Sequence, residues 1–372
     1  MLSRSRPGRA RFKLAFGLVC LGAVALIAAG CGGDDDDGDG DGTAGPPEDF
    51  TLTLPFQDSI VWNGYEIGKG AGGTFEEQCG LAPETVATEG NSFTIQQLIS
   101  GKVDYAISGA PEVFIANARG NELHGIANIY DDVFTVAATD ESGTESIEDL
   151  EGQALGVTDL GGGEIPLVNA VLNDAGLEPD QDVELKVVGP GGAAALKALE
   201  SGEVAAFAGA INDLVPLESG GLRFNTILPD EFIGLPSDLL VVRPEALEDE
   251  ELRDQLQCFM KAWYTATVFG EENPDEGLTR ICEEVPEDCQ DMEFARGFYD
   301  ATIDIAIDEA RRGGCSDYEA LTVTRDAVAA VDAPGAADVD PEEVFPNDFC
   351  EETVPSEDDV EAFAERAAGG TE

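Results

Sequence analysis

The chain has 372 residues, with 76 acidic and 20 basic side chains, and a formal net charge of −56 at pH 7. So much negative charge repels phosphate backbones and anionic lipid, which excludes nucleic-acid binding and electrostatic membrane binding. The length allows two lobes with cores of their own, since domains usually run to roughly 100 to 200 residues. The acidity indicates either a salt-adapted surface, which the scarcity of lysine favours, or attraction of cations or a basic partner.

Residues 1–30 have the features of a secretory signal peptide. Arginines and one lysine, without any acid, precede the apolar run LAFGLVCLGAVALIAAG, which is too short for a comfortable membrane span. The ending IAAGC resembles the lipobox of bacterial lipoproteins, although Ala28 stands where that motif most often has leucine. We therefore expect an extracytoplasmic protein anchored to a membrane by lipidation of Cys31, with ordinary secretion and a free Cys31 as the alternative.

Residues 31–50 are expected to form an acidic, glycine-rich tether that cannot bury apolar surface. Within it, Asp35, Asp37 and Asp39 imitate the start of a calcium-binding loop. Pro46 then occupies the twelfth position, where such a loop needs a bidentate glutamate. A solvated linker is the better interpretation.

From Thr51 onward, short apolar strands alternate with helical stretches. The expected strands are 50–56, 103–109, 134–139, 153–159, 183–189, 204–209 and 238–245, and the expected helices between them include 94–101, 165–177 and 193–202. After Pro244 the sequence is mostly helical, with long amphipathic stretches at 249–269 and 292–312. Strands separated by helices of roughly 10 to 15 residues predict crossover connections and an α/β fold with a mostly parallel sheet.

One unit occurs twice, as SGKVDYAISGA at 100–110 and as SGEVAAFAGA at 201–210. In each copy an amphipathic helix ends on Ser-Gly, where glycine supplies the left-handed conformation that stops a helix, and a buried strand follows. The repeat predicts two similar α/β lobes. Both present the carboxyl ends of their strands to a common cleft, which is where open parallel sheets bind ligands.

Six cysteines remain outside the signal peptide and the lipobox, and an exported protein is expected to pair them as disulfides. They are Cys79, Cys258, Cys282, Cys289, Cys315 and Cys350. The sequence leaves all fifteen pairings open. A metal site is not expected, because the chain has no CxxC motif and His124 is its one histidine.

The order of these signals resembles the type II periplasmic solute-binding proteins of ABC importers. More narrowly, it is similar to the family that binds thiamine pyrimidine precursors, alkanesulfonates, taurine, nitrate and riboflavin. The resemblance covers roughly 51–349 and is carried by Trp62 with Gly64 after the first strand and by the phrases QQLISGKVDYAISGA, SIEDLEGQALGV, LVNAVLNDAGLEPDQDVELKVVG, VVRPEALEDEELRDQLQCFMKAW and ENPDE.

The resemblance implies two lobes that close on a solute by hinge motion, after which the closed form docks on a membrane permease. It places the first part of lobe one at 51–138, lobe two at 139–240, and a return to lobe one with C-terminal helices at 241–372. It implies a monomer without a cofactor, whose partners are a small solute, the permease and the lipid anchor.

Loops that follow strand ends supply the expected solute-binding residues. Each has a structural alternative: Trp62 could be an apolar plug between the lobes, and Ser108 or Asn212 could only cap a helix. The run of glycines in TDLGGGEIP brings backbone close to a ligand, or is simply a flexible loop. The expected set is Trp62, Ser108, Gly109, Asp159, Gly161, Gly162, Asn212 and Asp213.

These loops contain carboxylates but no lysine or arginine, which favours a weakly basic N-heterocycle such as a thiamine pyrimidine precursor over an anion. A sulfonate, taurine or nitrate receptor of the same family is the alternative, and a structural surface lipoprotein is another. Catalysis is not expected. The related pyrimidine-forming enzyme needs an active-site histidine and a cysteine-rich motif, and no GxSxG elbow occurs in the chain.

Overall fold

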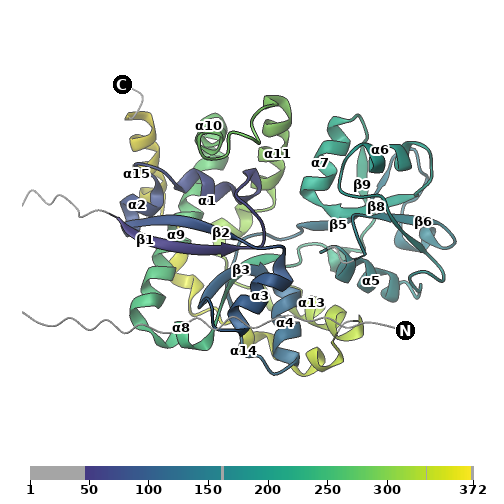
Figure 1. Cartoon of the computed structure of the whole chain (residues 1–372), viewed down its shortest axis with the longest axis horizontal. Coiled ribbons are helices and arrows are strands. Elements are labelled where there is room, and N and C mark those ends of the chain that lie inside the picture. Colours follow the sequence, from purple (N-terminus) through teal and green to yellow (C-terminus); the bar gives the residue numbers. More distant parts are fainter. Residues whose placement is uncertain (1–46, 161–162, 332, 370–372) are drawn as a thin grey trace, which may run out of the picture. The chain divides into compact units, whose positions relative to one another are not determined.

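The computed structural model describes residues 47–160, 163–331 and 333–369 (Figure 1). The expected signal peptide, Cys31 and most of the tether lie outside the described residues. The strands are β1 (Glu48–Leu54), β2 (Leu81–Ala87), β3 (Tyr105–Gly109), β4 (His124–Asn128), β5 (Phe134–Thr139), β6 (Ala154–Val157), β7 (Glu184–Val187), β8 (Ala206–Ala210), β9 (Phe224–Thr226) and β10 (Asp238–Val242).

Helices fill most of the intervals between the strands and nearly all of the chain after β10. They are α1 (Asn63–Gly68), α2 (Thr74–Cys79), α3 (Asn91–Ile99), α4 (Ala110–Ala118), α5 (Ile165–Asp174), α6 (Ala193–Glu200), α7 (Ile211–Ser219), α8 (Pro244–Glu248), α9 (Glu250–Glu272), α10 (Pro274–Glu284), α11 (Met292–Asp304), α12 (Ile307–Arg312), α13 (Tyr318–Val331), α14 (Pro341–Val344) and α15 (Glu357–Gly369). Among the helices of the described ranges, none combines the length and the apolar character that a bilayer crossing requires.

The strands form two sets with matching orders. One sheet has the order β7-β6-β8-β5-β9. The other set consists of a parallel pair, β1-β2, and a sheet β3-β10-β4, with β1 in contact with β3. Its combined order, β2-β1-β3-β10-β4, therefore repeats that of the first sheet, and the predicted two-lobed α/β fold is confirmed.

The expectation of a mostly parallel sheet was wrong in one respect. β5 runs antiparallel to β8 and β9, and β10 runs antiparallel to β3 and β4. Each is the first strand after the chain passes from one set of strands to the other. No crossover helix precedes it within its new sheet, and such a helix is what returns the chain to the end of the sheet from which a parallel strand starts. We therefore propose that the passages lie at 129–133 and 233–237, a few residues before the expected lobe boundaries at 138/139 and 240/241.

The repeated sequence unit occupies equivalent places in the two sets. Its strands are β3 and β8, each beside the antiparallel strand. Gly101 and Gly202 follow the preceding helices with φ of 65° and 67°, and their N–H groups donate to Leu98 O and Leu199 O. The predicted left-handed helix stop is confirmed at both positions.

An aromatic core surrounds α9, whose middle turns are fully buried. The ring of Phe259 lies between those of Phe50 and Phe75, at centroid distances of 4.4 and 4.7 Å. α1 crosses α9 at Gly64, where a Cβ atom would lie 2.6 Å from Trp263 Cδ1 and 2.7 Å from its carbonyl oxygen. The two helices pack this closely because Gly64 has no side chain.

Gly64→Ala is expected to destabilise the protein by about 1 to 3 kcal/mol, because the added methyl group has to push two helices apart. Urea unfolding measures the effect. Gly297, inside α11, is a matched control, since a Cβ there would meet nothing within 4 Å. Gly297→Ala should raise the free energy of unfolding by about 0.5 to 1 kcal/mol. An equal loss of stability in the two variants would contradict the argument that α1 and α9 pack closely at Gly64.

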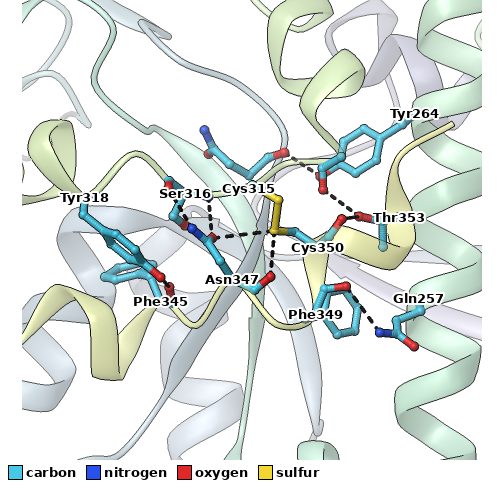
Figure 2. The surroundings of a disulfide bond; sticks show 12 residues. Gln257, Tyr264, Cys315, Ser316, Tyr318, Phe345, Asn347, Phe349, Cys350 and Thr353 are labelled. Carbon is cyan, nitrogen blue, oxygen red and sulfur yellow. Dashed lines mark hydrogen bonds between the residues drawn. A yellow bond between two sulfur atoms is a disulfide. The ribbon is translucent and has the colours of Figure 1, made fainter.

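All six described cysteines lie in pairs at disulfide distance. The pairs are Cys79–Cys258, Cys282–Cys289 and Cys315–Cys350. Around the third pair, Asn347 accepts from the Ser316 N–H at 2.8 Å and donates from Nδ2 to Ser316 O at 3.0 Å (Figure 2). This network fixes the start of α13, the helix that borders the cavity described next. None of the described residues forms a cluster of three or more metal-ligating side chains.

Candidate functional site

A cavity of about 70 Å³ lies between the two sets of strands. Its walls are the first turns of α3 and α4 from one set, β5 and α5 from the other, both linking segments and one side of α13. Residues far apart in the sequence therefore enclose one small space, as a solute site between two lobes requires.

The charged groups that line the cavity are all acidic. They are Glu112 on α4, Asp132 on the first linking segment and Asp238 at the start of β10, and the described lining contains no lysine, arginine or histidine. Asp238 is only 7% exposed, and its Oδ1 accepts a hydrogen bond of 3.3 Å from Asn91 Nδ2. Burial raises the pKa of Asp238 to about 6, although the bond from Asn91 opposes the shift.

Asp132 joins the two linking segments. Its carboxylate accepts from the Gly234 N–H at 2.8 Å and from the Leu235 N–H at 3.3 Å, and its own N–H donates to Leu235 O. Its φ of 52° is unusual for a residue other than glycine. Burial raises the pKa of Asp132, and the two backbone donors oppose that shift. Two backbone N–H donors therefore hold the Asp132 carboxylate, and a third hydrogen bond holds its main chain, at the passage between the lobes.

Helix starts at a cavity ordinarily favour anions, because they present free N–H groups and a positive partial charge. At α4 and α5 this effect is reduced, since the second helical residues are Pro111 and Pro166, which have no N–H. The Ala110 N–H is also engaged, donating to Ser237 O at 2.9 Å. The two helix starts therefore offer an anion few donors.

The remaining walls are mostly apolar, and Phe134 and Phe232 contribute aromatic rings. The ring of Phe134 packs on Gly163, where a Cβ would lie 2.5 Å from Cζ. Across the space, Thr324, Ala327 and Val328 of α13 close the cavity. α13 packs against both α4 and α5, so this C-terminal helix contacts both lobes.

Of the residues predicted from the first lobe, Gly109 lines the cavity and the other two lie behind it. Ser108 is buried, and its hydroxyl donates to Asn91 O at 3.2 Å. Trp62 is fully buried in the aromatic core, 4.6 Å from the Phe56 ring, and Nε1 has no acceptor among the described residues. That core also contains Ala210 and Val215 of the other lobe, so Trp62 is placed as the apolar-plug alternative describes.

Asp159, Asn212 and Asp213, the described residues of the set predicted from the second lobe, are absent from the described cavity lining. Asp213 is buried and accepts from the Ala210 N–H at 3.0 Å and the Gly191 N–H at 3.2 Å, so it caps α7 and fixes the loop before α6. Asn212 and Asp159 are exposed. Gly161 and Gly162 fall outside the described residues, and solute contact by this predicted set stays a prediction.

Sequence reasoning missed the side chains that give the cavity its character: Asn91, Glu112, Asp132, Phe134 and Asp238. Glu112 stands two residues after the repeated unit, and its position in the first turn of a helix at a strand end was a usable signal. The others gave none, because Asp132 lies in one linking segment and Asp238 directly follows the other, and the course of these segments depends on tertiary structure.

Comparison with protein families finds a match to the model described as "NMT1/THI5 like" over residues 72–277. Comparison with curated proteins finds no relative. Solved structures with the same fold include the periplasmic aliphatic sulphonate binding protein SsuA from Escherichia coli, with 13% identity and a TM-score of 0.61 over 82% of this chain and 99% of that one.

Two further structures agree in fold. A putative sulfonate ABC transporter's periplasmic binding protein from Methylobacillus flagellatus has 17% identity and a TM-score of 0.59, covering 83% of this chain and 94% of that chain. The periplasmic nitrate-binding protein NrtA from Synechocystis has 14% identity and a TM-score of 0.54, covering 87% and 92%. At these identities the likeness shows the fold alone.

Proposed function

The chain belongs to the NMT1/THI5-like family, and from this premise we propose that it is the extracytoplasmic solute-binding receptor of an ABC importer. The observation that carries the proposal is the cavity enclosed by both lobes, both linking segments and α13. A receptor of this kind captures one small solute between its lobes and presents the closed form to a permease.

The proposed solute is a small nitrogenous compound, for which a thiamine pyrimidine precursor or a similar N-heterocycle was the sequence-based candidate. Three lining carboxylates and the absence of a described lining cation support this class, because ring nitrogens and amino groups bond to carboxylates. The sulfonate or nitrate alternative draws support from the names of the structural neighbours. A buried anion beside Asp238 would nevertheless lack charge compensation.

Anchoring through Cys31, a monomeric state and docking on a permease belong to the same proposal. They rest on the lipobox-like ending and on what the neighbours are named for, since those proteins are described as periplasmic. A role in binding rather than catalysis is likewise proposed. The remaining alternative, a structural surface lipoprotein, predicts that no small solute stabilises the fold.

Thermal unfolding of residues 46–372 at high salt, with candidate solutes added singly, tests the function. The panel contains thiamine pyrimidine precursors, riboflavin, small alkylammonium ions, taurine, sulfonates and nitrate. A solute present at about a hundred times its Kd should raise the free energy of unfolding by about 2.7 kcal/mol, which corresponds to a rise of several degrees in Tm. If no compound raises the Tm of the folded protein, the receptor function is contradicted.

Two variants on one helix locate the binding. Ala327→Leu extends the α13 wall into the cavity and should abolish the rise in Tm. Ala330→Leu adds the same atoms at an exposed position of α13 and should leave it unchanged. Equal responses from the two variants would place the solute elsewhere.

A further inference from the structure

Within the proposed function, on which this inference rests, we infer that the solute is a small organic ammonium ion bound between the carboxylate of Asp238 and the rings of Phe134 and Phe232. Such a solute differs in charge from the sulfonates and nitrate for which the structural neighbours are named. It differs from a neutral pyrimidine as well.

The first argument is an uncompensated buried charge. Asp238 is more than nine-tenths buried, lines the cavity and forms no ion pair with any described residue. Its Oδ1 has one side-chain donor, Asn91 Nδ2, and no described group donates to Oδ2. The amide oxygen of Asn91, also buried, has no partner in the described ranges. The Asn91 amide oxygen at the cavity wall is therefore a buried acceptor without a described partner, beside the buried Asp238 carboxylate, and a ligand with positive charge or N–H donors would satisfy it.

The second argument is the balance of charge around the space. Glu112 and Asp132 are the other titratable groups that line it, and both add negative potential. Asp132 is satisfied by backbone donors from the second linking segment, whereas Asp238 has one side-chain donor, so Asp238 is better suited than Asp132 to act as counter-ion. The prolines in the first turns of α4 and α5 remove N–H groups that would otherwise attract an anion.

The third argument concerns the shape and chemistry of the walls. Two phenylalanine rings beside carboxylates form the combination that binds alkylated ammonium ions, through attraction of the cation to the ring faces together with ion pairing. Most of the other lining residues are aliphatic, as N-alkyl groups require, and Asn91, Ser237 and Thr324 are polar. A cavity volume of about 70 Å³ accommodates a compact ion.

Three probes with the same number of non-hydrogen atoms test the inference by isothermal titration calorimetry at constant ionic strength. They are tetramethylammonium, neutral tert-butanol and methanesulfonate. We expect saturable one-to-one binding of tetramethylammonium only. Asp238→Asn should weaken it at least tenfold, and Phe232→Leu should weaken it several-fold.

Asp254→Asn is the matched control, because it removes one negative charge at an exposed position of α9 and should change the affinity less than twofold. Binding of methanesulfonate or tert-butanol in place of tetramethylammonium would overturn the inference and leave the receptor function standing. Equal affinity of the Asp238 and Asp254 variants would also overturn it. If neither these probes nor the wider solute panel binds, the inference and the proposed function fail together.

Discussion

Removal of the Cys79–Cys258 pair is expected to destabilise the protein more than removal of either other disulfide. The sequence separations are 179, 35 and 7 residues for Cys79–Cys258, Cys315–Cys350 and Cys282–Cys289. In the chain-entropy model, these loops correspond to losses of about 5, 4 and 2 kcal/mol, because a longer loop gains more freedom in the unfolded chain. The first bond also joins the end of α2 to α9, the central helix of the aromatic core.

Paired serine substitutions and urea unfolding under non-reducing conditions measure these losses. The Cys282/Cys289 double variant serves as the internal control, since it removes a bond of the same type from a short loop. A loss that is largest for Cys282–Cys289 would contradict the loop-length argument and indicate that packing around each bond decides the order.

The fold could be predicted in large part because local chemistry and tertiary structure agree. Gly101 and Gly202 stop helices where the sequence requires it, and β5 begins and ends at the predicted residues. β2, β4 and β9 were missed. β2 contains Pro83, and β9 is a short strand at the edge of its sheet, so neither has the alternating apolar pattern of a strand.

The candidate site could be predicted only at the level of strand ends. Gly109 lines the cavity as that rule requires, but Asp213 turns its carboxylate to the backbone of its own lobe. Sequence alone could not separate these cases, since a carboxylate at a helix start serves equally as a cap or as a ligand. Asp238 and Asp132 reach the cavity because the linking segments cross there, which is a property of the topology.

Asp238→Asn is expected to stabilise the solute-free protein at neutral pH by about 3 kcal/mol, the value of a shift of about two pKa units. The pKa of Asp238 is raised to about 6 by burial, from an ordinary value near 4. A raised carboxyl pKa contributes stability that is fully present below the unfolded-state pKa and is lost as pH rises through the folded-state value. The free energy of unfolding of the wild type should therefore drop below that of the variant as the pH rises from about 4 to about 6.

Urea unfolding from pH 4 to pH 8 measures the difference, with Asp254→Asn as the control for the loss of one surface charge. The difference in free energy of unfolding between the Asp238→Asn variant and the wild type should vanish near pH 4, where the side chain at position 238 is neutral in both proteins. It should reach its full size above pH 7. Glu112 and Asp132, the other charged residues of the described lining, are unchanged in the variant. A variant less stable than the wild type at pH 8 would mean that the charged carboxylate is compensated in the folded state. In that case the buried charge of Asp238 would not destabilise the solute-free protein. The argument that Asp238 lacks a positively charged partner, which a cationic solute would supply, would then fail.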